Sequence, residues 1–255
     1  AWLLNVRGGD VPRTPFALGY AVIDKDGKVD LFMDPRKLTQ EARVHLGNEV
    51  AVGEPAGFLS ALDRLGKAGA VVAVDAMTAG IAVSDRLKAA GAKPQIGEDP
   101  CALPKACKNP VEVEGARAAH RRDGAAVSKF LRWLSIEAPK GGLDEIKAAD
   151  RLADFRRGNE MFRDFSFDSI SAAGPNGAIC HYKVTPESNR PIPVDSLFLI
   201  DSGGQYLDGT TDITRTIAVG KVSAEMKDRF TRVLKGHIAL ATTRFPKGTT
   251  GSALD

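Results

Sequence analysis

Leu197-Phe198-Leu199-Ile200-Asp201-Ser202-Gly203-Gly204 begins the stretch that decides the fold of this chain, and Asp208-Gly209-Thr210-Thr211-Asp212-Ile213-Thr214-Arg215-Thr216 ends it. The apolar run at 197–200 predicts a buried strand, and the β-branched residues at 213–219 predict a second strand. Glycines between the two runs indicate turns. We therefore expect a β-hairpin with one carboxylate on each arm, Asp201 on the first and Asp212 on the second.

The two aspartates are candidate metal ligands. A carboxylate that follows four apolar residues is costly to bury alone, and two neighbouring carboxylates repel unless a cation or a proton lies between them. Carboxylate oxygens are the ligands that hard divalent ions prefer. The spacing itself is not specific, because a turn-capping aspartate and an exposed aspartate would produce the same pattern without a metal.

The run DSGGQYLDGTTDITRT (201–216) closely resembles the metal hairpin of the Xaa-Pro aminopeptidases, or aminopeptidase P. These are pita-bread metallopeptidases, as are methionine aminopeptidase, prolidase and creatinase. The resemblance continues through NPVEVEGARAAHRRD (109–123), PKGG (139–142) and GPNGAICHY (174–182). It implies that Asp201 and Asp212 each bind one or both ions of a dinuclear site.

Strands and helices alternate along the first part of the chain, which predicts an α/β domain over residues 1–108. Strands are expected at 2–6, 16–23, 29–33, 70–74 and 93–96, and helices at 39–46, 55–65 and 75–90. WLLNVRGGDVP (2–12) and VDLFMDP (29–35) resemble the middle domain of the long, three-domain aminopeptidase P enzymes. Methionine aminopeptidase usually lacks that domain.

Residues 109–255 are expected to form the second domain. Asn109 and Pro110 predict the start of a long helix, and a second helix is expected at 144–157, with Ile146, Ala149, Leu152 and Phe155 facing inward. Strands at 165–172 and 179–182, the hairpin and a helix at 223–244 follow. This order resembles the first half of the pita-bread fold. The expected fold class is α/β (α+β), a creatinase-like N-terminal domain followed by a partial pita-bread catalytic domain.

His181 and Thr214 complete the candidate site. A lone histidine in this position is ordinarily a structural residue of the core or a loop. Its match to an I-x-H-Y segment of the family implies that His181 lines the active site, binding substrate or stabilising the developing oxyanion. Thr214 lies two residues past Asp212, hence on the same face of the strand, and is expected to steady the ligands. Arg215 is expected to point the other way and form an ion pair.

The resemblance implies a metal-dependent aminopeptidase that hydrolyses the N-terminal Xaa-Pro peptide bond with a hydroxide that bridges two divalent ions. Manganese is the expected metal, with zinc and cobalt as alternatives. The expected partners are peptides with proline at the second position and a second copy of the chain in a homodimer. A prolidase, which cleaves Xaa-Pro dipeptides, and a non-catalytic pita-bread module that binds peptides or histones are the alternative functions.

Composition argues against several other classes of protein. The 255 residues carry a net charge of +3 without a basic stripe, so we expect no nucleic-acid partner. The apolar runs are too short to span a bilayer, and residues 1–255 contain no pattern typical of a signal peptide. An odd number of cysteines, without zinc-type spacing, predicts reduced thiols and a cytoplasmic location.

One departure from the family pattern concerns the remaining metal ligands. The family completes its site with a histidine and two glutamates in segments that do not occur in these 255 residues. Two carboxylates are too few for a tight dinuclear site. We therefore expect the sequence to be part of a longer protein, and expect residues 1–255 alone to be inactive and poorly folded.

Overall fold

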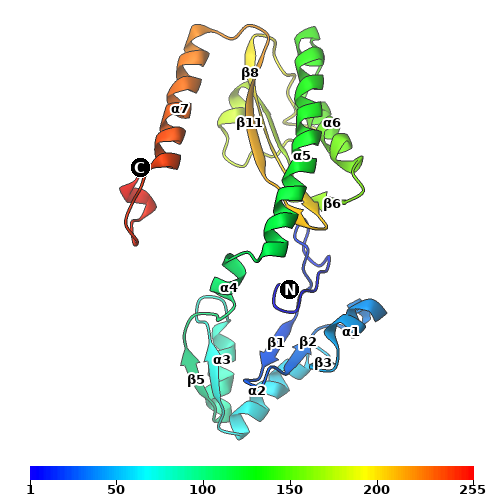
Figure 1. Ribbon diagram of the computed structural model, residues 1–255, viewed down its shortest axis with the longest axis vertical. Coiled ribbons are helices and arrows are strands. Elements are labelled where there is room, and N and C mark those ends of the chain that lie inside the picture. Colours follow the sequence, from blue (N-terminus) through cyan, green and yellow to red (C-terminus); the bar gives the residue numbers. More distant parts are fainter. The chain divides into compact units, whose positions relative to one another are not determined.

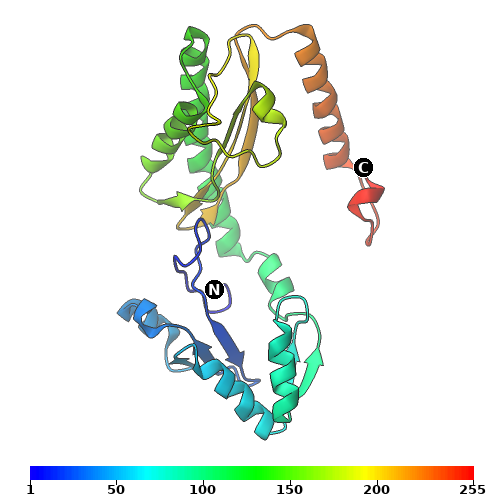
Figure 2. The ribbon, with the colours of Figure 1, turned by 180° about the vertical axis from the view of Figure 1, so that it is seen from behind.

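The computed structural model describes residues 1–255, which divide into two compact units, Ala1–Val113 and Glu114–Asp255. Figures 1 and 2 show the chain from opposite sides. The division falls in the first turn of a long helix. The expected domain boundary between residues 108 and 109 stays a prediction.

The first unit mixes short strands and helices. Its elements are β1 (Tyr20–Ile23), β2 (Val29–Phe32), α1 (Gln40–Leu46), β3 (Val50–Gly53), α2 (Gly57–Lys67), β4 (Val71–Val74), α3 (Ile81–Ala90), β5 (Lys93–Ile96) and α4 (Ala102–Ala106). β2 pairs antiparallel with β1 and parallel with β3, while β4 and β5 form a separate parallel pair. The alternation of strands and helices predicted from the sequence is confirmed.

Helices α2 and α3 form the main core of this unit with the strands. Phe58 and Leu62 of α2 and Leu87 of α3 are buried against Phe32 of β2. Gly66 lets the two helices approach closely, because a Cβ atom there would lie 2.2 Å from the Cβ of Ala90.

Two predictions in the first unit are wrong. Residues 2–6 form turns instead of a strand, because Asn5 adopts a left-handed conformation and its backbone N–H donates to Trp2 O over 3.1 Å. Residues 75–80 are not helical, because the carboxylate of Asp75 accepts hydrogen bonds from Met77 N and Asp99 N. The strand β3 was not predicted.

The second unit contains two small sheets flanked by helices. Its elements are α5 (Pro110–Glu137), α6 (Glu145–Arg157), β6 (Phe162–Phe165), β7 (Ile170–Ala173), the 3-10 helix η3 (Gly174–Ala178), β8 (Ser196–Ser202), β9 (Gly204–Tyr206), β10 (Gly209–Thr210), β11 (Ile213–Val219) and α7 (Ala224–Thr242). The strand orders are β11-β8-β7 and β10-β9-β6, with every pair antiparallel.

The predicted start of α5 is confirmed. Asn109 Oδ1 accepts a hydrogen bond from Glu112 N, and Glu112 Oε2 accepts one from Asn109 N, each over 2.9 Å. This reciprocal pair satisfies two backbone donors that a helix start would otherwise leave free, and Pro110 needs no partner at the first helical position.

Helices α5 and α6 cover one face of the sheet β11-β8-β7, and the loop after η3 lies on its other side (Figure 1). The core between helices and sheet includes Phe130 of α5, Leu152 of α6, and Phe198 and Ile200 of β8, all fully or almost fully buried. Because side chains alternate along a strand, the neighbours of Phe198 and Ile200 point to the opposite face.

We call that opposite side the open face. Its members are Leu197, Leu199 and Asp201 of β8 and Thr214, Thr216 and Ala218 of β11, which stand directly opposite one another in the register. The metal hairpin predicted from the sequence is therefore present. It carries a smaller hairpin, β9–β10, at its tip.

Three predictions in the second unit are corrected. The strand expected at 165–172 is two strands, β6 and β7, and residues 179–182 are not a strand. The inward face of α6 is only partly as expected: Leu152 is buried, but Ile146, Ala149 and Phe155 are only partly covered. Glu145, Ala148, Ala153 and Arg156 are buried instead. Two charged residues lie inside because distant segments supply their partners.

Helix α7 begins at the predicted cap, where Ser223 Oγ accepts a hydrogen bond from Met226 N. None of its residues is buried. Met226 and Phe230 line a cavity of about 220 Å³ with Leu197 and Ala218 of the open face. No helix of the structure has both the length and the apolar character needed to cross a bilayer.

Candidate metal centre

Asp201 is the next-to-last residue of β8 and belongs to the open face. Its Oδ1 atom is buried and has no hydrogen-bond partner. A buried carboxylate oxygen without a donor is costly in a folded protein, and such orphaned atoms are rare. The position therefore suits a cation that would lie against this oxygen.

Asp212 directly precedes β11, whose first residue, Ile213, stands opposite Ser202. Asp212 is largely exposed, but partial desolvation of its carboxyl, the negative charge of Asp201 and a hydrogen bond shared with Asp201 together raise the pKa of this group. The two carboxyl groups are thus close enough to oppose each other's ionisation. Either a shared proton or a cation relieves this repulsion.

Thr211 fixes the backbone next to Asp212. It is almost completely buried, its Oγ1 accepts a hydrogen bond from Gly204 N over 3.0 Å, and its N–H donates to Gly204 O over 2.9 Å. Ser166 Oγ donates to Thr211 O from the adjoining loop. The hydroxyl, N–H and carbonyl of Thr211 therefore all form hydrogen bonds, and these fix the backbone that leads through Asp212 into β11.

We expect Gly203→Ala to destabilise the folded protein by about 1–3 kcal/mol, through overpacking at the metal hairpin. A Cβ atom at this position would lie 2.0 Å from Thr211 O and 2.2 Å from Ser166 Oγ. Urea unfolding of the full-length protein measures the change. Gly236→Ala is the control: no atom lies within 4 Å of its added Cβ in α7, and alanine should stabilise that helix by about 0.5–1 kcal/mol. Equal stability of Gly203→Ala and the wild type would contradict the prediction.

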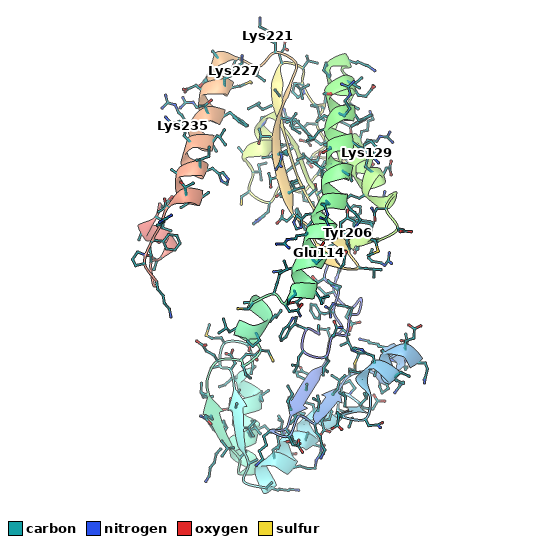
Figure 3. All side chains as sticks on the ribbon, in the orientation of Figure 1. Glu114, Lys129, Tyr206, Lys221, Lys227 and Lys235 are labelled. Carbon is teal, nitrogen blue, oxygen red and sulfur yellow. The ribbon has the colours of Figure 1, made fainter.

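A buried ion pair lies behind the hairpin. Arg156 Nε of α6 donates to Asp123 Oδ1 of α5 over 2.7 Å, and the Tyr206 hydroxyl of β9 donates to the same oxygen over 2.8 Å. Figure 3 shows Tyr206 beside α5. Burial, followed by the hydrogen bond to Asp123, raises the pKa of Tyr206. None of these three residues was predicted from the sequence as part of the site. The one available signal was that Asp123 shares the buried face of α5 with Ala119, Val127 and Phe130.

Thr214 stands directly opposite Asp201 in the β8–β11 register, so the two residues share the open face. Its side chain is exposed. Arg215 stands opposite Ile200 and points to the other face, as expected. The ion pair predicted for Arg215 is not formed, because its guanidinium instead donates to Thr214 O over 2.7 Å.

His181 lies in a turn after η3 and has a positive φ of 54°. Its ring is exposed, and its Nδ1 lies 3.8 Å from Cys180 Sγ. The segment that leads to it rests on the open face, since a Cβ atom at Gly177 would lie 3.9 Å from the Cβ of Leu199. No hydrogen bond joins His181 to Asp201 or Asp212 in the structure.

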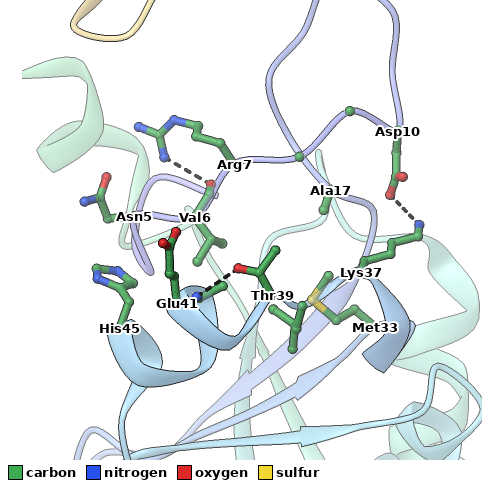
Figure 4. A pocket seen from close by; sticks show the side chains of 14 residues that line it. Asn5, Val6, Arg7, Asp10, Ala17, Met33, Lys37, Thr39, Glu41 and His45 are labelled. Atoms are coloured by element: carbon green, nitrogen blue, oxygen red, sulfur yellow. Dashed lines mark hydrogen bonds and ion pairs between the residues drawn. The ribbon is translucent and has the colours of Figure 1, made fainter.

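The first unit contains a separate cavity of about 410 Å³ (Figure 4). Arg7, Asp10 and His45 line it, but none of the predicted site residues does. Asp10 forms an ion pair with Lys37, and His45 Nε2 lies 3.0 Å from Leu4 O. These contacts agree with the structural roles that residues of this kind usually have.

The described residues offer two candidate metal ligands and not a complete set. No group of three or more His, Cys, Asp and Glu side chains is arranged to hold a metal ion. Asp201 and Asp212 nevertheless fit a divalent ion, because two oxygen ligands lie together and one carboxylate oxygen is buried without a partner.

Both units of the chain resemble known protein families. Residues 114–255 match the model of metallopeptidase family M24, and residues 1–112 match that of the creatinase/prolidase N-terminal domain. The chain is 40% identical over 284 residues to aminopeptidase P2 of Arabidopsis thaliana. It is 43% identical over 265 residues to a probable Xaa-Pro aminopeptidase P of Phaeosphaeria nodorum. Each match covers 100% of this chain and 40% of the relative.

Among solved structures, the X-prolyl aminopeptidase of Caenorhabditis elegans, described as a cytosolic enzyme with a dinuclear active site, matches with a TM-score of 0.90. It is 34% identical, and the match covers 100% of this chain and 42% of that protein. The predicted fold class, a creatinase-like domain followed by part of a pita-bread domain, is thereby confirmed. The chain belongs to metallopeptidase family M24.

Proposed function

We propose that this chain is part of a Xaa-Pro aminopeptidase, a hydrolase that removes the first residue from peptides with proline in second place. Residues 1–108 would form its middle domain, and residues 109–255 the first half of its catalytic domain. The observation that carries the proposal is the buried, unpartnered Oδ1 of Asp201 on the open face, together with the neighbouring carboxyl of Asp212 at the start of β11. Relatives named as Xaa-Pro aminopeptidases, matched along the whole chain, support it.

Asp201 and Asp212 would hold the metal. When two divalent ions are bound, they supply an activated water and polarise the scissile carbonyl. Manganese is the proposed metal, with zinc and cobalt as alternatives, since oxygen ligands suit all three. The C. elegans enzyme, with its dinuclear active site, supports the number of ions.

The remaining residues would orient the reacting groups. The Thr214 hydroxyl lies opposite Asp201 and would steady the carboxylates by hydrogen bonding. His181 would donate a hydrogen bond to the substrate carbonyl as negative charge develops on its oxygen. We further propose a cytoplasmic homodimer; the description of the C. elegans relative as cytosolic supports the location.

Hydrolysis of Arg-Pro-Pro by the full-length protein tests this function. We expect the protein to release free Arg. This release should be lost on chelation with EDTA and restored by Mn²⁺. Arg-Ala-Pro, in which alanine replaces the second residue, is the control and should stay intact. A folded, Mn²⁺-loaded protein that cleaves only the dipeptide Arg-Pro would be a prolidase, and one that cleaves neither peptide would be a binding module.

A further inference from the structure

A buried carboxylate lies at the root of the loop that carries His181. Glu145, the first residue of α6, is completely buried. Four donors surround its two oxygens: Ala173 N at 2.7 Å, Asn176 Nδ2 at 2.9 Å, the Tyr182 hydroxyl at 2.8 Å and Arg190 N at 3.1 Å. None of them is a cationic side chain. A buried carboxylate is tolerated here because four hydrogen bonds satisfy its two oxygens.

The four donors come from both ends and the middle of one loop. Ala173 ends β7, Asn176 lies in η3, and Arg190 lies shortly before β8. Glu145 therefore joins the two ends of the segment 174–190 to α6. This segment has no strand of its own, so these bonds take the place of a sheet ladder.

Tyr182 is the contact between Glu145 and the middle of the loop. Its hydroxyl donates to Glu145 Oε2 and lies 3.0 Å from Ser188 Oγ, which in turn accepts from Thr185 N over 2.9 Å. Tyr182 is buried, whereas its neighbour His181 is exposed. Tyr182 N donates to Ile179 O across a turn, with His181 in a left-handed conformation inside it.

We propose that Glu145, acting through the Tyr182 hydroxyl, is the positioning residue for His181. The buried tyrosine fixes one end of the turn, and with it the backbone from which the exposed side chain of His181 extends. Such support matters because a displacement of about 1 Å of a reacting group costs roughly a hundredfold in rate. The inference rests on the proposed role of His181 in substrate binding.

Tyr182→Phe tests the anchor, by which we mean the hydrogen bond from the Tyr182 hydroxyl to Glu145, because it removes that hydroxyl and keeps the buried ring. Replacing Glu145 would instead leave four donors unpaired and could prevent folding. Hydrogen exchange of the full-length protein is the readout that needs no activity. Exchange in residues 176–190 is expected to rise about tenfold, with β8 and β11 unchanged. Tyr20→Phe is the matched control, because Tyr20 stacks on Phe58 in the first unit and should leave this loop unchanged. Unchanged exchange in Tyr182→Phe would overturn the anchor.

A double-mutant cycle on Arg-Pro-Pro hydrolysis tests the link to His181. With His181 present, we expect Tyr182→Phe to lower kcat/KM about tenfold. In the His181→Ala background, Tyr182→Phe should lower kcat/KM less than twofold. Metal content should be equal in all four proteins. Equal losses in both backgrounds would overturn the inference, because a purely structural effect does not depend on His181. A wild-type protein that releases no Arg would instead contradict the proposed function, and the exchange result would still decide the anchor.

Discussion

Asp201→Asn is expected to abolish metal binding and to lower Xaa-Pro hydrolysis about a thousandfold or more, since a catalytic metal supplies several kcal/mol of transition-state stabilisation. Asparagine keeps the shape of the side chain but lacks the negative charge. The Oδ1 atom of the Asp201 carboxylate is buried and has no donor in the protein. Loss of the charge also removes the repulsion that, together with partial desolvation, raises the pKa of Asp212, so the folded protein should be at least as stable as the wild type without metal.

Isothermal titration with Mn²⁺ measures the metal binding, and Arg release from Arg-Pro-Pro measures the activity. Asp208→Asn is the matched control, because Asp208 lies in the same hairpin but pairs with Arg122. That variant should bind Mn²⁺ with wild-type stoichiometry. An Asp201→Asn protein that still binds two Mn²⁺ ions would refute the assignment of Asp201 as a ligand.

The hairpin that carries the two aspartates could be predicted because its signals are local. An apolar run followed by a carboxylate predicts a buried strand with a polar end, and strand alternation predicts which side chains share a face. The register that places Thr214 opposite Asp201 agrees with that alternation. The start of α5 was predictable for the same reason, since Asn109 and Glu112 satisfy each other within one turn.

The errors arose where distant segments decide the structure. Glu145 and Arg156 were not among the residues of α6 expected to face inward, yet both are buried. Their partners lie up to 45 and 33 positions away in the sequence, and only the fold brings them together. Residues 179–182 look like a strand by composition, yet the anchor of Tyr182 to Glu145 draws them into a turn. Local periodicity carries no information about such contacts.

Arg156→Met is expected to destabilise the folded protein by about 3–5 kcal/mol at neutral pH, since it leaves a buried carboxylate without its cation. The side chains of Arg156 and Asp123 are 0% and 3% exposed, and two hydrogen bonds join them. Methionine fills much of the same space, so the cost should come from charge and not from a cavity. Urea unfolding of the full-length protein gives the free energy of unfolding.

Arg232→Met is the matched control for the same substitution in an exposed pair. Arg232 pairs with Asp228 one helical turn away in α7, and their side chains are 70% and 52% exposed. Solvent screens such a pair, so the expected cost is at most about 0.5 kcal/mol. Similar losses of unfolding free energy in Arg156→Met and Arg232→Met would show that burial does not determine how much the Arg156–Asp123 pair stabilises the protein.

The pH dependence of the Arg156→Met effect separates charge from packing. Burial alone raises the pKa of Asp123, but the hydrogen bonds and charge of Arg156 outweigh it and hold this pKa below its usual value. A depressed carboxyl pKa stabilises the folded state above the unfolded pKa, which is about 3.9, and this contribution disappears as the pH falls through the folded value. Without Arg156, burial raises the pKa of Asp123, and protonation relieves the buried charge. The difference in unfolding free energy between wild type and variant should therefore be largest at pH 7 and shrink towards pH 4, whereas a difference that does not change with pH would assign the loss to packing.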